Sequence, residues 1–208
     1  MKALLIIDVQ NDFCLGGSLA VPSANEVIPI INEMIKLSYS NNDLVVATQD
    51  WHPEGHGCFA STHKVPVFSM GTLNGSPQVM WPNHAIQNSY GSKLHSDLLD
   101  IPTVFCKGMD PTVDSYSGFF DNGGKNDTGL NKWLKEANVD EVYICGLATD
   151  YCVKFTALDA VKLGYNTIVV SDACRGVNFP EGSVKTACAE MTNAGVFFLN
   201  SEVVLGTR

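Results

Sequence analysis

Short, unbroken runs of apolar residues recur along the chain, and most of them end at or near a charged residue. The runs lie at residues 3–7, 44–48, 103–106, 142–145, 167–170 and 196–199. Continuous rather than alternating apolar character is typical of parallel strands that are covered on both faces. We therefore expect a mostly parallel sheet of six buried strands.

Between these runs, apolar residues recur every three or four positions, which is the spacing of one face of a helix. Such stripes fall at residues 27–37, 130–137, from about 152 onward, and at about 181–194, where Gly195 provides a stop. Residues 23–26 have the form of a capping box for the first helix, although Pro29 lies awkwardly deep in it. The alternation predicts a three-layer α/β fold, with residues 1–208 in a single domain.

One segment, at about residues 51–102, interrupts this alternation after the second strand. It contains a single short helical pattern, at 92–99, among several prolines and glycines. A connection of this length inside a compact domain is usually functional or disordered. Aromatic residues such as Trp51, Phe59 and Trp81 argue against disorder. We expect a folded insertion that contributes to the functional site.

Composition and charge exclude several classes of protein. An apolar fraction of 45% and a charged fraction of 17% are those of a soluble globular protein. The net charge of −9, with no basic run, argues against binding to nucleic acid. No apolar run reaches the ~20 residues that span a bilayer, and no signal-peptide pattern precedes the first strand. The seven cysteines are scattered and form no C-x-x-C pair, so we expect reduced thiols and a cytoplasmic protein, with homo-oligomerisation left open.

The strongest indication of chemistry surrounds Cys152. The apolar run at 142–145 leads through Gly146 into a helical pattern, with Thr149 and Asp150 as candidate caps. Cys152 is thus expected in the first turn of a helix that follows a strand. Unpaired backbone N–H groups and the helix dipole favour a thiolate there. The competing interpretation is a structural cysteine, because free cysteines are among the most buried residues.

Two further ionisable residues, Asp8 and Lys107, also stand at predicted strand ends. The carboxyl ends of parallel strands form the ligand crevice of an open α/β sheet. A carboxylate beside a thiol accepts its proton, and a nearby ammonium stabilises negative charge. Alone, Asp8 could be a turn residue and Lys107 a surface lysine. Their coincidence with Cys152 at three strand ends favours a nucleophile with its base and electrostatic partner.

A second constellation consists of Asp50, His52 and His84. Asp50 and His52 are two positions apart, so in extended backbone both side chains project to one side. His84 lies in the insertion, as does His56, which is close enough in sequence to be a fourth ligand. An Asp/His/His set suits a divalent transition metal such as zinc, iron or manganese. Solvated loop histidines are the plainer interpretation of this pattern.

Six motifs follow one another along the chain: IDVQNDF at 7–13, QDWHP at 49–53, WPNH at 81–84, KG at 107–108, DSYSGF at 114–119 and GLATDYCV at 146–153. In these motifs the chain resembles the nicotinamidases of the isochorismatase-like cysteine hydrolase superfamily. The Asp–Lys–Cys set is shared by much of the superfamily, whereas the D-x-H and W-P-x-H motifs point to nicotinamidases. Ala85 departs from the cysteine that often follows W-P-x-H, at a position that is not a ligand.

The resemblance implies a role for each matching residue. Cys152 would be the nucleophile, Asp8 the general base and Lys107 its electrostatic partner. The remaining implied roles are metal binding by Asp50, His52 and His84, a substrate pocket lined by Phe13, Trp81 and Tyr116, and an oxyanion site made of the backbone N–H groups of Ala148 and Cys152. The resemblance also implies a cis peptide bond between Ala148 and Thr149.

The implied reaction is the hydrolysis of nicotinamide to nicotinate and ammonia through a thioester, within NAD salvage, with pyrazinamide as a further substrate. One divalent metal, zinc before iron or manganese, would position the pyridine nitrogen. The alternatives are a hydrolase of the same superfamily for another small amide or an isochorismatase-type substrate, and a binding protein that retains the fold. A thiol redox protein is disfavoured because no resolving cysteine stands near Cys152 in sequence.

Overall fold

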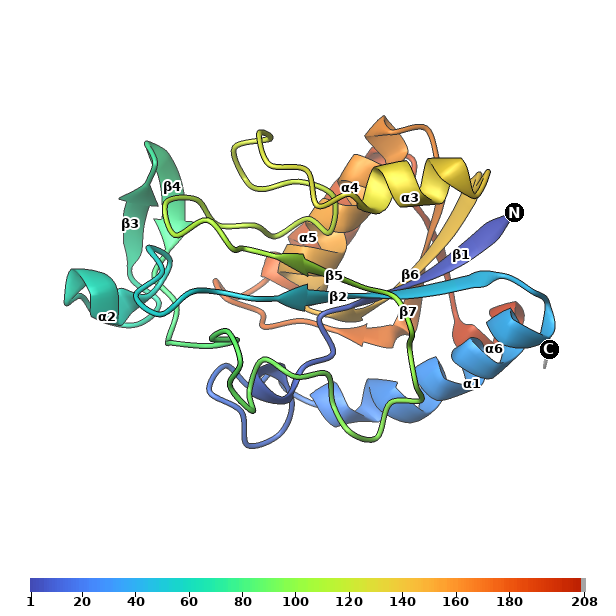
Figure 1. Ribbon diagram of the computed structural model, residues 1–208, viewed down its shortest axis with the longest axis horizontal. Helices are drawn as coiled ribbons and strands as arrows, with labels where there is room; N and C mark the ends of the chain where they lie inside the picture. Colours follow the sequence, from blue (N-terminus) through green and yellow to red (C-terminus); the bar gives the residue numbers. More distant parts are fainter. Residues whose placement is uncertain (207–208) are drawn as a thin grey trace.

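A parallel sheet lies between two layers of helices in the computed structural model, which describes residues 1–206 (Figure 1). The six strands follow the order β5-β2-β1-β6-β7-β8, and every neighbouring pair is parallel. The strands are β1 (Lys2–Ile7), β2 (Leu44–Asp50), β5 (Val104–Lys107), β6 (Glu141–Leu147), β7 (Asn166–Arg175) and β8 (Phe197–Leu199). The predicted three-layer α/β fold is confirmed, and its mostly parallel sheet is parallel throughout.

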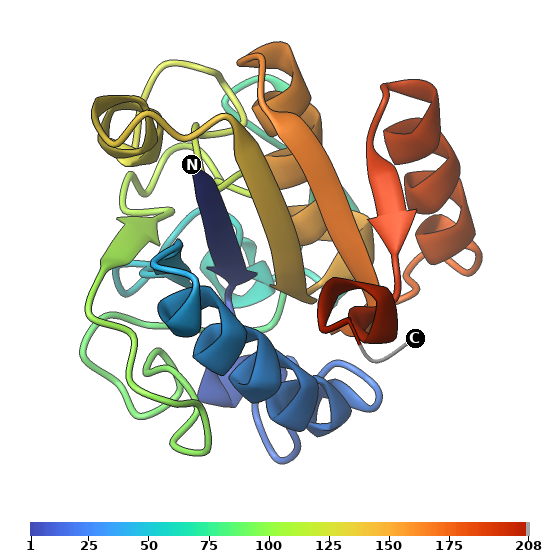
Figure 2. The same ribbon diagram turned by 90° about the vertical axis from the view of Figure 1, so that its right-hand side faces the viewer.

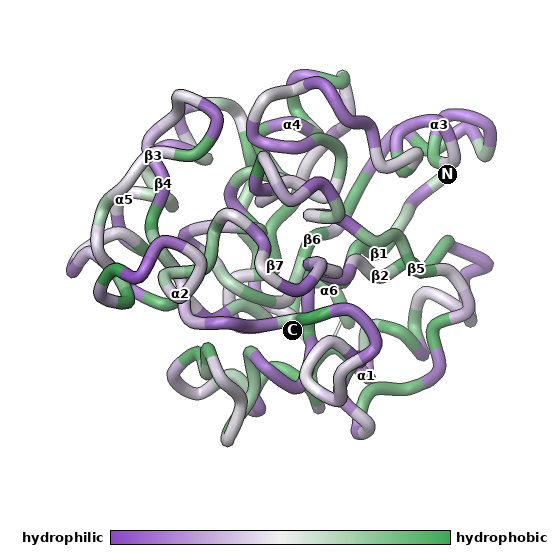
Figure 3. The backbone as a smooth tube through the Cα atoms, turned by 60° about the vertical axis from the view of Figure 1, so that its left-hand side comes forward, coloured by the Kyte–Doolittle hydropathy of each residue, from purple (hydrophilic) through white to green (hydrophobic). Residues whose placement is uncertain are grey.

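The helices divide between the two faces of this sheet (Figures 1 and 2). One face is covered by α1 (Val27–Ser40) and α6 (Ser201–Val204), and the other by α3 (Leu130–Glu136), α4 (Lys154–Lys162) and α5 (Ser183–Asn193). Hydrophobic residues gather in the central strands, whereas hydrophilic residues dominate the outer helices and loops (Figure 3). None of the helices within residues 1–206 is long and apolar enough to cross a membrane.

The start of α1 differs from the predicted capping box. Ser23 adopts a left-handed conformation with φ of 57° and caps nothing, and a 3-10 turn, Ala24–Glu26, leads into α1. Since Val27 is the first residue of α1, Pro29 falls in its first turn, where a backbone N–H would have no partner inside the helix. The position of Pro29 is therefore compatible with a helix that begins later than the capping box predicted.

The order of the strands locates the crevice. The chain runs outward from β1 to β2 and β5, returns to β6 beside β1, and then runs outward to β7 and β8. At such a switch point the two neighbouring strands lead their following loops in opposite directions, which opens a crevice at their carboxyl ends. Asp8 directly follows β1, and Cys152 lies in the turn after β6.

The insertion after β2 contains a short helix, α2 (Ala60–His63), and an antiparallel hairpin, β3 (Met70–Leu73) and β4 (Ser76–Val79). The predicted helix at 92–99 is wrong, because this segment consists of turns. The Ser92 carbonyl accepts hydrogen bonds from the side chains of Gln10 and Gln49, and the Lys93 carbonyl accepts the Asn11 N–H. These carbonyls bond to distant segments, so they are not available for helical hydrogen bonds.

Candidate active site and metal centre

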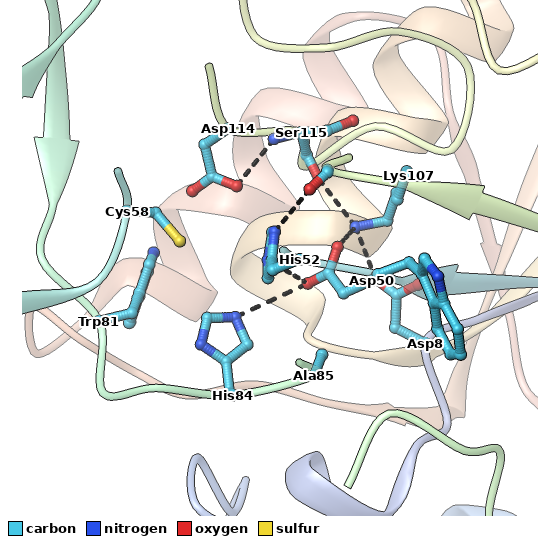
Figure 4. Close-up of polar contacts among 12 residues, drawn as sticks. Asp8, Asp50, His52, Cys58, Trp81, His84, Ala85, Lys107, Asp114 and Ser115 are labelled. Atoms are coloured by element: carbon cyan, nitrogen blue, oxygen red, sulfur yellow. Dashed lines mark hydrogen bonds and ion pairs between the residues drawn. The ribbon is translucent and has the colours of Figure 1, made fainter. Parts of the chain in front are cut away.

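Lys107, at the end of β5, lies at the centre of the candidate site, and its side chain is fully buried. Its Nζ atom forms ion pairs with Asp8 Oδ2 at 2.9 Å and with Asp50 Oδ1, as Figure 4 shows. It also donates to the Ser115 carbonyl at 2.8 Å and lies 3.4 Å from Cys152 Sγ. Because a buried ammonium is strongly destabilising unless it is paired, the two carboxylates are what keep Lys107 charged there.

The effect appears in the pKa of Lys107. Burial alone would lower it, but Asp50 and Asp8 raise it well above its usual value. Lys107 thus stays positively charged across the physiological range, between two negative groups and within reach of the thiol. The electrostatic role expected for Lys107 from the sequence stays a prediction.

Asp8 is fixed by the residue opposite it on β2. Its backbone has a positive φ of 48°, which turns the chain sharply at the end of β1. The Thr48 hydroxyl donates to Asp8 Oδ1 at 2.7 Å and accepts the Asp8 N–H at 3.3 Å. Burial raises the pKa of Asp8, although Lys107 opposes this effect. A carboxylate with a raised pKa is a better proton acceptor than an exposed one.

Cys152 lies in a π-helical turn, Thr149–Val153, between β6 and α4. We call this segment the Cys152 turn. The predicted caps are wrong: Ala148 occupies the position before the turn and makes no side-chain cap, and Asp150 bonds to another loop. The cis peptide bond joins Leu147 to Ala148, one bond earlier than the resemblance implied.

The protonation of Cys152 differs from the simple expectation of a thiolate. Burial raises the pKa of the Cys152 thiol well above its usual value, and Lys107 opposes the shift without overcoming it. The resting group is therefore a thiol. A carboxylate oxygen of Asp8 and the Cys152 Sγ lie within 4.8 Å of each other, so Asp8 is placed to accept the proton.

Asp50, His52 and His84 converge beside this pair of residues (Figure 4). Asp50 Oδ2 lies 3.6 Å from His52 Nε2 and 3.8 Å from His84 Nε2. The opposite ring nitrogens are held at 2.8 Å by backbone carbonyls, those of Gly108 and Pro82, and so each Nε2 faces Asp50. His52 Nε2 is buried and has no hydrogen-bond partner among the described residues.

These observations fit a cation. The separations exceed those of hydrogen bonds but match the roughly 3.4 Å between neighbouring ligands of a tetrahedral metal with bonds of ~2.1 Å. A backbone carbonyl on the second ring nitrogen is the usual support of a metal-binding histidine. Burial lowers the pKa of His84 to about 4, whereas Lys107 keeps the pKa of Asp50 low despite burial. His84 is therefore neutral and Asp50 charged, which are the forms that bind metals, whereas Asp50 raises the pKa of His52 against the effect of burial.

His56 packs against His52, with ring centroids 4.4 Å apart, but its nitrogens are already engaged. Its Nε2 lies 2.8 Å from the Asp110 carbonyl, and its Nδ1 accepts the Cys58 N–H at 3.1 Å. A neutral imidazole has one donor and one acceptor nitrogen. Both are used here, so no lone pair of His56 is directed at Asp50.

A cavity opens beside these groups, lined by Asp8, Asp50, His84 and Cys152 among others. The three predicted pocket residues, Phe13, Trp81 and Tyr116, all line it, and Trp81 Nε1 donates to the Tyr116 hydroxyl at 3.3 Å. The other lining residues are Asp8, Leu19, Val21, Asp50, His84, Asp114, Leu147, Ala148, Tyr151, Cys152 and Val177. An aromatic wall facing a few polar groups is typical of a site for a small ring-shaped ligand.

Sequence reasoning missed several contributors. Gln10 is fully buried and clamps the backbone of Asp50, donating to its carbonyl at 2.8 Å and accepting its N–H at 2.9 Å. A glutamine three residues beyond a buried strand, within the matched motif at 7–13, was an available signal. Tyr151 was indicated only by its position next to Cys152, and nothing local to Val177 indicated its place in the cavity.

Comparison with known proteins agrees with this geometry. The isochorismatase domain family matches residues 2–203. A nicotinamidase of Escherichia coli (strain K12) is 50% identical over 196 residues, which cover 93% of this chain and 92% of that protein. A solved nicotinamidase/pyrazinamidase of Acinetobacter baumannii has a TM-score of 0.93 at 41% identity, covering 98% of this chain and 97% of its own. A pyrazinamidase of Pyrococcus horikoshii in complex with zinc has a TM-score of 0.80 at 35% identity, covering 96% and 98%.

The parallel sheet, the site at its switch point and a match along nearly the whole chain define a hydrolase of the isochorismatase-like superfamily. Within that superfamily, the chain belongs to the nicotinamidase family. The family predicted from the six motifs is therefore confirmed.

Proposed function

We propose that this protein hydrolyses nicotinamide to nicotinate and ammonia through a thioester on Cys152, and that it serves NAD salvage. Pyrazinamide, a similar ring amide, is proposed as a second substrate. One observation carries the proposal: Cys152, Lys107 and Asp8 meet at one end of a cavity whose wall is aromatic. The similarity to nicotinamidases and pyrazinamidases supports it.

In the first half of the reaction, Asp8 accepts the thiol proton and Cys152 Sγ attacks the carboxamide carbon. Lys107 offsets the negative charge that develops beside it. We propose that the backbone N–H groups of Ala148 and Cys152 hold the carbonyl oxygen as it becomes an oxyanion. Asp8 then gives its proton to the amide nitrogen, the C–N bond breaks, ammonia leaves, and a thioester remains.

The second half releases the acid. Asp8, again a carboxylate, accepts a proton from a water molecule whose oxygen attacks the thioester carbon. The C–S bond breaks, the sulfur regains the proton from Asp8, and nicotinate leaves. One carboxylate therefore serves both halves. Its buried position between Thr48 and Lys107 keeps it aimed at the sulfur throughout.

We further propose that Asp50, His52 and His84 hold one divalent cation, with zinc before iron or manganese. When bound, it would supply a Lewis-acidic contact for the pyridine nitrogen. Two histidines and a carboxylate suit zinc, and the similar Pyrococcus horikoshii protein forms a zinc complex. His56 would stay outside the coordination sphere, because both of its ring nitrogens already have partners.

Ammonia release from a panel of amides tests the function. We expect turnover of nicotinamide and pyrazinamide, much slower turnover of benzamide, which lacks the ring nitrogen, and none of aliphatic amides. Equal turnover of benzamide would remove the proposed contact to the ring nitrogen. Turnover of aliphatic amides alone would favour a different amidase of the superfamily, and no turnover of any amide would contradict the function.

A further inference from the structure

The loop at residues 176–180, between β7 and α5, forms part of the cavity wall, and we call it the wall loop. It contributes Val177 to the lining beside Cys152. Nothing in its local sequence indicates this role, since it is far from the six motifs. The loop is held in place by two consecutive residues of the Cys152 turn, Asp150 and Tyr151.

Asp150 makes most of these contacts. Its side chain is buried, with 3% of the residue exposed. Asp150 Oδ1 accepts the Val177 N–H at 2.9 Å, and Oδ2 accepts the Asn178 N–H at 2.8 Å and the Ser183 hydroxyl at 2.5 Å. Charge-assisted hydrogen bonds of this kind are about twice as strong as neutral ones. The Asp150 carboxylate thus links the wall loop and the start of α5 to the Cys152 turn.

Two further contacts hold the wall loop close to the Cys152 turn. The Tyr151 hydroxyl donates to the Phe179 carbonyl at 2.5 Å. At Gly176, a Cβ atom would lie 2.9 Å from Asp150 Oδ1 and 2.3 Å from Val184 Cγ2, so the close approach of loop and carboxylate leaves no room for a side chain. The position of Val177 relative to Cys152 is therefore fixed mainly through Asp150.

We propose that Asp150 is a positioning residue for the ring substrate, acting by holding Val177 in the wall of the cavity that Cys152 also lines. This inference rests on the proposed function in so far as a ring amide is the substrate. Asp150 touches neither the substrate nor the reacting atoms. Its effect comes from the wall that it fixes, because a displacement of about 1 Å at such a wall costs up to 100-fold in the rate of an oriented reaction.

The test is a double-mutant cycle on ammonia release from nicotinamide. Asp150→Asn keeps the shape of the side chain but places an amide nitrogen against a backbone N–H. Val177→Ala removes two methyl groups from the cavity wall without changing Asp150. We expect each to raise KM about tenfold with a smaller fall in kcat. If Asp150 acts through Val177, the double variant is no worse than the poorer single variant. Additive effects on KM would overturn the inference.

Asp172 provides a matched control, because it makes the same kind of contact at α6. It accepts the Ser201 N–H at 2.8 Å and the Ser201 hydroxyl at 2.5 Å, and it does not line the cavity. Asp172→Asn should lose thermal stability much as Asp150→Asn does, while its KM stays at the wild-type value. An equal rise in KM in Asp172→Asn would mean that a general loss of stability explains the effect.

A second readout does not need nicotinamide. Cys152 is 7% exposed, and we expect displacement of the wall loop to increase that exposure. Iodoacetamide should alkylate Cys152 several-fold faster in Asp150→Asn and Val177→Ala, and at the wild-type rate in Asp172→Asn. Unchanged alkylation in both wall variants would overturn the inference even if the wild type hydrolyses nicotinamide. If the wild type hydrolyses no ring amide, the proposed function fails, and alkylation still decides whether Asp150 holds the wall.

Gly176→Ala keeps the test decisive if Asp150→Asn does not fold. Its added methyl group would crowd Val184 Cγ2 and Asp150 Oδ1, and so displace the wall loop while the carboxylate itself is retained. We expect it to raise KM and to speed alkylation as Val177→Ala does. Wild-type values for both would contradict the claim that the position of the wall loop matters.

Discussion

Lys107 shows how single residues determine the chemistry of this site. It is a buried cation between two carboxylates, and it also touches the thiol. The pKa of Cys152 is raised by burial in spite of Lys107, so the proposed mechanism needs Asp8 to accept the thiol proton. Reactivity therefore depends on the group of three residues rather than on the helix start that the sequence indicated.

Replacing the nucleophile should separate chemistry from folding. We expect Cys152→Ala to abolish ammonia release while its melting temperature stays near that of the wild type, and Cys152→Ser to be nearly as poor, because a hydroxyl ionises far less readily than a thiol. Cys188→Ala, at a half-buried cysteine of α5, is the control and should retain activity. Activity of Cys152→Ala within tenfold of the wild type would remove the covalent mechanism.

Replacing the cation should change both reactivity and stability. Lys107 lowers the pKa of the Cys152 thiol, so Lys107→Met should move the pH profile of Cys152 alkylation to higher pH. Two buried carboxylates would also lose their partner, at a cost of roughly 3–5 kcal/mol of folding stability. Lys162→Met, which removes an exposed pair with Asp159, should change neither quantity. An unmoved alkylation profile would show that Lys107 does not act on the thiol.

At the scale of elements, strands and site residues differ in how far the sequence determines them. The six strands were predictable, because burial on both faces requires continuous apolar runs. The three strand-end residues Asp8, Lys107 and Cys152 were predictable for a related reason, since a parallel sheet gathers its carboxyl ends at one edge. The segment at 92–99 was not, because its carbonyls bond to Gln10, Gln49 and Asn11 from elsewhere in the chain.

Local patterns also could not reveal which distant groups a side chain would meet. Asp150 has the sequence context of a helix cap, yet its carboxylate bonds to Val177 and Asn178. His56 matches the spacing of a metal ligand, but the positions of Asp110 and Cys58 decide what its nitrogens bind. Candidate ligands follow from residue type and spacing, whereas their availability follows from tertiary packing.

The proposed metal centre joins two elements, and removing the metal should loosen one of them. His52 lies two residues after the end of strand β2, and His84 lies in the insertion, five residues after the end of β4. We expect chelation or His84→Ala to raise KM and lower kcat for nicotinamide, and also to speed proteolysis within residues 53–84. His63→Ala changes an exposed histidine of the same insertion and is the control. Full activity and unchanged proteolysis after exhaustive chelation, with no metal by elemental analysis, would contradict the metal centre.

At the scale of the whole molecule, the seven cysteines share one property. All are free thiols, and burial raises the pKa of every one above its ordinary value of 9.0. Two of them, Cys145 and Cys174, are buried on the neighbouring strands β6 and β7. Burial raises the pKa of Cys174 to about 12 and raises that of Cys145 well above its ordinary value. Above pH 9, the folded protein therefore keeps thiol protons that the unfolded chain releases.

This difference makes folding stability depend on pH. The contribution of a protected thiol is complete below pH 9 and is lost as the pH rises toward the folded-state pKa, because only the unfolded chain releases the proton. At pH 10 the loss is about 1.4 kcal/mol for each fully protected thiol. Urea unfolding of the reduced protein should therefore show a lower free energy of unfolding at pH 10 than at pH 7.5.

The comparison with Cys174→Ala isolates the contribution of one thiol. That variant leaves a small cavity and is less stable at both pH values, but its loss between them should be smaller by about 1.4 kcal/mol, since lysines and tyrosines titrate alike in both proteins. An equal loss in the two proteins would mean that Cys174 ionises as freely in the folded state as in the unfolded chain, contrary to its buried position in β7.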